Sequence, residues 1–213
     1  MNETTKGFDT EKINWMTKYF AFILTLLILT SCLQKSSDIS KCDCEELTLV
    51  ENLNTWMLNN KPYTGDCETF YNNGVRESFS TFKNGKIHGT LISYYKNGKI
   101  EESVEYINSM PHGKVVYYFQ NGDTSEFGVV ENDKKNGEWI GYYENGNLMY
   151  KHNWQNDLLK DSAFDYFEDG TVKMKGFFVQ GKADGIWSFY DSLTGKIDGF
   201  IEYQNDSVIR KFN

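Results

Sequence analysis

The chain has 213 residues, a formal net charge of −8 and an aromatic content of 16%. This acidic balance argues against nucleic acid as a partner, and against docking of the folded part on anionic lipid headgroups, because both are bound by basic surfaces. With 18 glycines and only two prolines, the composition is typical of many short strands joined by glycine-bearing turns.

Near its start the chain has the organisation of a secretory signal peptide. Lys18 supplies a positive charge, and an apolar run follows over residues 20–29. A run of about ten residues is too short to span a membrane, which needs roughly 20. The run ends in Leu-Thr-Ser-Cys at residues 29–32, which resembles the lipobox of bacterial lipoproteins. The resemblance implies that Cys32 is lipidated. An uncleaved signal anchor and a buried core helix are the alternatives.

These features predict where the chain is located and how it is divided. Residues 1–15 carry mixed charges, so Met16 is the expected start of the precursor. We expect a signal peptide over 1–31, a lipidated cysteine with a polar tether over 32–46, and a repeat domain over 47–213. A lipid anchor implies the bacterial cell envelope, most simply the outer membrane on its periplasmic or surface side.

Three cysteines remain besides Cys32, at positions 42, 44 and 67. Outside the cytoplasm they predict one disulfide with one thiol left over. Cys42 and Cys44 are too close for a relaxed mutual bridge in an extended chain, so Cys67 is expected to pair with one of them. Free buried thiols are one alternative. A metal site is another, although three cysteines without a nearby histidine suit zinc poorly.

A dipeptide recurs every 24 residues from Asn73-Gly74 to Asp169-Gly170, with copies of Asn-Gly beginning at 97, 121 and 145. Asn-Gly and Asp-Gly accept positive φ, so each copy predicts a two-residue type I′ hairpin turn. A turn at a fixed period indicates a tandem array of one supersecondary unit.

Other residue types keep the same period. Each repeat unit is expected to hold two strands, and a glycine precedes the first of them at 65, 89, 113, 137 and 185, with Asp161 as the exception. Adjacent aromatics such as Tyr94 and Tyr95 must face opposite sides of a strand, so both faces of the sheet should carry aromatic ladders. The predicted fold is all-β: an extended, twisted antiparallel meander of about six tandem hairpins in a single-layer sheet. Residues 47–58 are interpreted as a degenerate half-repeat at its front.

These units resemble the MORN-repeat variant of bacterial YwqK-type proteins. The closest matches to the form Gly-x-aromatic-x-x-Tyr-Tyr-x-Asn-Gly-x-Leu are residues 137–148 (GEWIGYYENGNL) and 89–100 (GTLISYYKNGKI). The resemblance covers about residues 60–210 and implies an extended hairpin array. Members of this family are often labelled antitoxins, which implies protein binding, whereas an exported chain would not meet a cytoplasmic toxin.

No catalytic set stands out in the sequence: there is no nucleophile elbow, phosphate loop or HExxH motif. His88 and His112 share a repeat position, which raises the question of a metal site. Acidic residues such as Glu126 and Asp165 could pair in a glycosidase. Solvent-exposed segments between the repeats explain the histidines, and solvent-exposed strand faces explain the acidic residues. We therefore expect no enzyme, no metal and no cofactor.

Aromatic residues are the remaining candidates for a binding site. Trp139 and Trp187 share a column two residues after the glycine, and with Tyr95 and Tyr143 they form the expected exposed binding face. Packing within the sheet is the alternative. The expected function is a lipid-anchored envelope scaffold that binds a protein partner. An antitoxin or immunity protein that neutralises a toxin, and an envelope glycan binder, are the other hypotheses.

Overall fold

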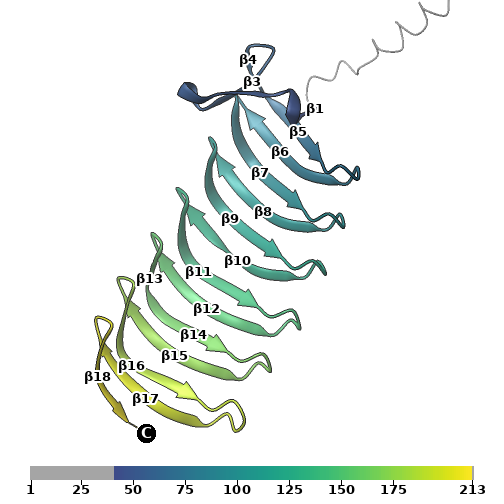
Figure 1. The fold of residues 1–213 in the computed structure, drawn as a ribbon. Coiled ribbons are helices and arrows are strands. Elements are labelled where there is room, and N and C mark those ends of the chain that lie inside the picture. Colours follow the sequence, from purple (N-terminus) through teal and green to yellow (C-terminus); the bar gives the residue numbers. More distant parts are fainter. Residues whose placement is uncertain (1–40, 213) are drawn as a thin grey trace, which may run out of the picture. The chain divides into compact units, whose positions relative to one another are not determined.

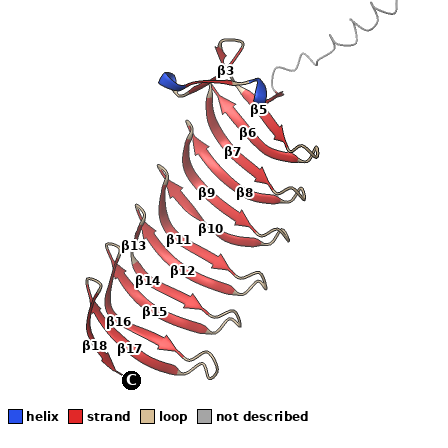
Figure 2. Cartoon of the chain, in the orientation of Figure 1, coloured by secondary structure: helices blue, strands red, loops and turns tan. Residues whose placement is uncertain are grey.

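The computed structural model describes residues 41–212. The predictions for the signal peptide and for lipidated Cys32 therefore lie outside the described residues. Within the described part no helix is long and apolar enough to cross a membrane. Strands dominate this part, and the two helical segments are single short turns (Figure 2).

A 15-stranded sheet contains the repeats, and from β5 onward hairpin follows hairpin (Figure 1). Its strands are β1 (Lys41–Asp43), β5 (Gly65–Phe70), β6 (Arg76–Lys83), β7 (Lys86–Tyr94), β8 (Ile100–Ile107), β9 (Met110–Tyr118), β10 (Thr124–Glu131), β11 (Lys134–Tyr142), β12 (Leu148–Gln155), β13 (Leu158–Leu159), β14 (Asp161–Tyr166), β15 (Val172–Val179), β16 (Lys182–Tyr190), β17 (Ile197–Gln204) and β18 (Ser207–Phe212). The sheet does not close on itself, so the predicted all-β meander is confirmed.

The front of the described chain differs from the expected half-repeat. Residues 47–58 contribute to a separate three-stranded sheet of β2 (Thr48–Val50), β3 (Thr55–Leu58) and β4 (Lys61–Pro62), with the 3-10 helices η1 (Cys44–Glu46) and η2 (Glu51–Leu53) beside it. This small sheet is hydrogen-bonded to the turn between β6 and β7, where the Trp56 N–H donates to the Gly85 carbonyl at 2.8 Å. A Cβ on Gly85 would lie 2.7 Å from the Trp56 carbonyl oxygen, so the contact requires glycine.

The folded part also begins earlier than the expected domain boundary. Strand β1 pairs in parallel with β5, and η1 follows it directly, so residues 41–46 belong to the fold although the sequence placed them with the tether. Leu47 packs in a small core with Tyr63, Cys67 and Phe82.

The prediction of a two-residue turn at each Asn-Gly is wrong, and the two-residue turns lie at the other end of the hairpins. The connectors between repeats are the two-residue turns with positive φ at both positions, as at Asn84 (51°) and Gly85 (75°). The repeated Asn-Gly lies instead in a longer loop, residues 71–75 in the first copy, where Gly74 has a φ of 79° and Asn73 does not have a positive φ. The Asn73 side chain accepts the Val75 N–H at 3.1 Å, and this bond stabilises the longer loop.

One repeat is irregular beside the position where aspartate replaces the glycine of the column. The column that is glycine elsewhere has positive φ, for example 112° at Gly89 and 119° at Gly113, and Asp161 adopts 61°. Aspartate tolerates this left-handed conformation better than most side chains do. Where β11 runs unbroken for nine residues, the corresponding segment is divided into β13 and β14 at Lys160.

Candidate functional site

The two faces of the sheet carry different side chains, and we name them after the residues that distinguish them. The tryptophan face carries a row of residues that lie opposite one another on neighbouring strands: Ser80, Leu91, Val104, Val115, Gly128, Trp139, His152, Ala163, Gly176 and Trp187. The phenylalanine face lies on the other side, because consecutive residues of a strand point to opposite faces.

Both tryptophans of this row are buried, with 1% of Trp139 and 5% of Trp187 exposed. Each lies over a glycine of the preceding strand. A Cβ added to Gly128 would lie 2.3 Å from the Trp139 ring, and one added to Gly176 would lie 2.0 Å from the Trp187 ring. The expectation that these tryptophans form an exposed binding face is therefore wrong, because the glycines let their rings pack against the sheet.

A second row of the tryptophan face repeats this arrangement. Glycines there stand directly opposite large side chains on the next strand: Gly65 with Phe82, Gly89 with Tyr106, Gly113 with Val130, Gly137 with Trp154 and Gly185 with Tyr203. Phe82 and Val130 are buried in this row, while Tyr106, Trp154 and Tyr203 are half-buried.

The two tyrosines of the expected binding face connect neighbouring repeats. The Tyr95 hydroxyl donates to the Tyr118 carbonyl at 2.6 Å, and the Tyr143 hydroxyl donates to the Tyr166 carbonyl at 2.9 Å. Next to Tyr95, the amide of Asn97 donates to the Gln120 carbonyl at 3.0 Å. Both tyrosines are half-buried. Their period of 24 residues thus reflects bonds between successive loops.

Acidic and tyrosine side chains alternate along a third row of the tryptophan face: Glu102, Tyr117, Glu126, Tyr150 and Asp165. Burial raises the pKa of the Tyr117 hydroxyl, and the charges of Glu102 and Glu126 raise it further. Burial, followed by a hydrogen bond with Glu126, raises the pKa of Tyr150 well above its usual range. These tyrosines are neutral hydroxyls beside charged carboxylates.

The carboxylates of this row are already bound within the protein. Glu126 Oε1 lies 2.9 Å from Lys135 Nζ, and Asp165 Oδ1 lies 2.7 Å from His152 Nε2. The Lys135 ammonium also lies over the Trp139 ring, 3.8 Å from its centroid. Glu126 and Asp165 are therefore members of a bonded network. Among residues 41–212 no group of three or more potential ligands is placed to hold a metal ion.

The phenylalanine face carries a different kind of row. Its apolar members, which we call the phenylalanine strip, are Phe79, Ile92, Val116, Phe127, Ile140 and Phe164. All of them except Val116 are half-buried, and no glycine interrupts the row. Val116, Phe127 and Ile140 are direct neighbours, whereas Ser103 separates Ile92 from Val116 and Lys151 separates Ile140 from Phe164.

An open groove of about 540 Å³ lies on this strip. Val116 and Phe127 line it together with Tyr118 and Tyr142, and Lys114 lies at its border. The Phe127 and Tyr142 rings stack with centroids 6.3 Å apart. The sequence predicts aromatic ladders on both faces but does not indicate which of the two stays accessible.

Both basic and acidic residues lie along the strip: Asp123 lines the groove with Lys114, whose backbone N–H donates to Glu105 Oε2 at 2.8 Å. Lys151 and Lys175 continue the row on both sides of Phe164. At the other end, Glu68 is paired with Arg76 at 2.7 Å. The strip therefore presents lysines on a chain whose overall charge is negative.

Comparison with known families matches two segments, residues 87–108 and 135–156, to a family described as "MORN repeat variant". Each segment spans one hairpin, β7–β8 and β11–β12, with its long loop. A comparison with curated proteins found no match to the chain. The family match supports a repeat scaffold built from hairpins of this type.

Proposed function

We propose that the chain is a non-catalytic scaffold, held at the bacterial cell envelope by a lipid on Cys32, that binds a protein partner through the phenylalanine face. The observation that carries this proposal is the phenylalanine strip with its groove, an apolar row left partly in water on a sheet whose other face packs its large rings over glycines. Contiguous exposed apolar surface on a soluble protein commonly marks an interaction site.

The side chains of this face suit a protein surface. Aromatic residues supply large contact areas at the centre of protein interfaces. Tyr118, Phe127 and Tyr142 meet at one groove, which offers a pocket for an apolar anchor from the partner. Lys151 and Lys175 on both sides of Phe164 favour a partner that carries carboxylates near that part of the strip.

The direct test is affinity capture of the mature lipoprotein from its native envelope, with matched variants. Ile140→Ser removes an apolar side chain from the centre of the strip. Leu193→Ser is the control, because Leu193 is 93% exposed in the loop between β16 and β17. We expect one stoichiometric protein that is retained by the control and lost by Ile140→Ser.

The other outcomes of this capture decide between the remaining hypotheses. A partner with toxin activity that the chain suppresses would assign the antitoxin or immunity role. Capture of polysaccharide alone, or a protein partner bound equally by both variants, would overturn the proposed surface. The anchor is tested separately with Cys32→Ala, which should release the protein from the membrane fraction. Retention at the membrane would contradict lipidation at this position.

A further inference from the structure

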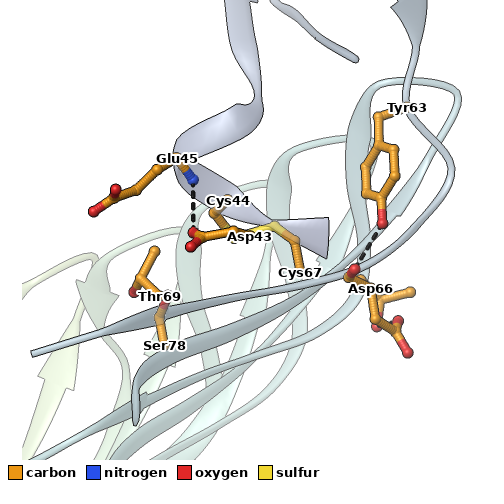
Figure 3. The surroundings of a disulfide bond; sticks show 9 residues. Asp43, Cys44, Glu45, Tyr63, Asp66, Cys67, Thr69 and Ser78 are labelled. Atoms are coloured by element: carbon orange, nitrogen blue, oxygen red, sulfur yellow. Dashed lines mark hydrogen bonds between the residues drawn. A yellow bond between two sulfur atoms is a disulfide. The ribbon is translucent and has the colours of Figure 1, made fainter. Parts of the chain in front are cut away.

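A disulfide joins the front of the fold to the first repeat (Figure 3). Cys44 is the first residue of η1, and Cys67 lies in β5, with Sγ atoms 2.09 Å apart and Cα atoms 5.1 Å apart. This is one of the two pairings that the sequence left open. Cys67 is 0% exposed, whereas Cys44 is half-buried.

The strand register pairs the backbone of the third cysteine with that of Cys67. Strand β1 runs parallel to β5, and the register pairs Lys41 with Asp66, Cys42 with Cys67 and Asp43 with Glu68. Neighbouring strands lie about 4.8 Å apart. A disulfide accepts Cα separations of roughly 4.4–6.8 Å. The backbone positions of Cys42 and Cys44 are therefore both within bridging distance of Cys67.

We propose that Cys42 and Cys44 compete for Cys67 by intramolecular thiol–disulfide exchange, so that the front of the fold has two interchangeable covalent attachments. The Cys42 thiol loses its proton and its thiolate attacks Sγ of Cys67. The bond between the Cys44 and Cys67 sulfurs breaks as the bond between the Cys42 and Cys67 sulfurs forms. Cys44 leaves as a thiolate and takes up a proton. One disulfide and one thiol exist before and after the step, so it requires no oxidant or reductant.

Burial of Cys67 favours this internal route over reaction with outside thiols. Exchange requires the attacking thiolate to reach a disulfide sulfur in line. The Cys67 sulfur is shielded by Leu47, Tyr63 and Phe82, which pack around it. Cys42 belongs to the strand that pairs with β5 at Cys67, so an internal exchange does not require a thiol to enter from solvent.

The two attachments would have different consequences for the front of the fold. A bridge at Cys44 fixes η1, which is otherwise held by weaker contacts such as the Glu45 N–H donating to Asp43 Oδ1 at 3.0 Å. A bridge at Cys42 fixes β1 instead and leaves the half-buried Cys44 as the free thiol. Exchange therefore moves the reactive thiol from a sheet edge to a helical turn.

The test is a disulfide map of the full chain, prepared oxidised and held at pH 8 before quenching in acid. Free thiols are then alkylated, and cleavage before Asp43 separates Cys42 from Cys44, so that each label is assigned to one position. We expect the label to divide between Cys42 and Cys44, with Cys67 always bridged. Label confined to Cys42 at every incubation time would overturn the proposal.

Two variants test the second bridge directly. In Cys44→Ser we expect Cys42 to form a disulfide with Cys67, which leaves neither thiol open to alkylation. In the control Cys42→Ser the bridge between Cys44 and Cys67 should remain. If oxidised Cys44→Ser keeps two free thiols while Cys42→Ser is bridged, the proposal is wrong. The division of label in the unaltered chain does not depend on the folding of either variant.

Discussion

The tryptophan face and the phenylalanine face are built from similar residue types, yet one buries its central tryptophans and the other leaves its phenylalanines partly exposed. The difference lies in the glycines. On the tryptophan face, Gly128 and Gly176 lie beneath tryptophan rings, which therefore pack flat against the backbone. On the phenylalanine face every position of the strip carries a side chain, and Phe127 stands opposite Ile140 on the neighbouring strand. A single sheet can thus make a core on one side and present an interaction surface on the other.

The largest expected loss of stability comes from removing a buried tryptophan of the tryptophan face. Trp139→Ala should lower the free energy of unfolding by about 3–5 kcal/mol, because it removes a fully buried ring and leaves a cavity over Gly128. Chemical denaturation followed by circular dichroism measures this loss. A loss below about 1 kcal/mol would show that the ring is not part of a packed core.

The glycine beneath a tryptophan provides the next test. Gly176→Val should destabilise the protein by about 1–3 kcal/mol, because the new side chain collides with the Trp187 ring. The double variant with Trp187→Val recreates the valine pair that occurs naturally at Val104 and Val115. Its loss in unfolding free energy should be smaller than the sum of the two single losses. Additive losses would contradict the packing of Trp187 on Gly176.

A smaller effect is expected where the glycine column is broken. Asp161→Gly should raise the free energy of unfolding by about 1 kcal/mol, since glycine adopts the 61° φ at no steric cost. The ion pair lost with Lys160, at 3.9 Å and exposed, contributes little. The reverse change, Gly137→Asp in the regular repeat, is the matched control and should be destabilising. If Asp161→Gly lowers the unfolding midpoint, the irregularity of this repeat has another cause.

The smallest effect is expected on the open face. Val129 is 42% exposed beside the strip. Val129→Ser should change the unfolding free energy by less than about 0.5 kcal/mol, because little apolar burial is lost. Comparison with Trp139→Ala in the same denaturation series measures the contrast between the faces. Equal losses would remove the distinction between them.

The sequence was sufficient for the architecture but not for the accessibility of the binding residues. The 24-residue period predicts the hairpin array because each copy needs the same loop and connector. It misplaced the two-residue turns, because loop length and not the Asn-Gly pair decides the turn type. The burial of Trp139 depends on Gly128, which lies eleven positions earlier on the neighbouring strand. The repeat positions of Gly128 and Trp139 vary together: they hold glycine with tryptophan in two repeats and valine with valine in another. This pattern is the signal that could have identified the core.

The choice between Cys42 and Cys44 was outside the reach of the sequence for a different reason. The two cysteines are separated by one residue. The parallel pairing of β1 with β5 sets Cys42 opposite Cys67, and Cys44 follows directly after β1 and bridges to Cys67. The spacing of cysteines along a chain does not predict which strand positions pair, and so does not predict the disulfide.

Hydroxyl-radical footprinting of side chains, in the purified protein and in its native envelope, tests the central claim most directly. The account predicts that Phe127 and Phe164 are oxidised in the purified protein and protected in the envelope, while Trp139 and Trp187 remain unreactive in both. Ready oxidation of the tryptophans in the purified protein, or equal oxidation of the phenylalanines in both preparations, would contradict a closed tryptophan face and a partner bound on the phenylalanine face.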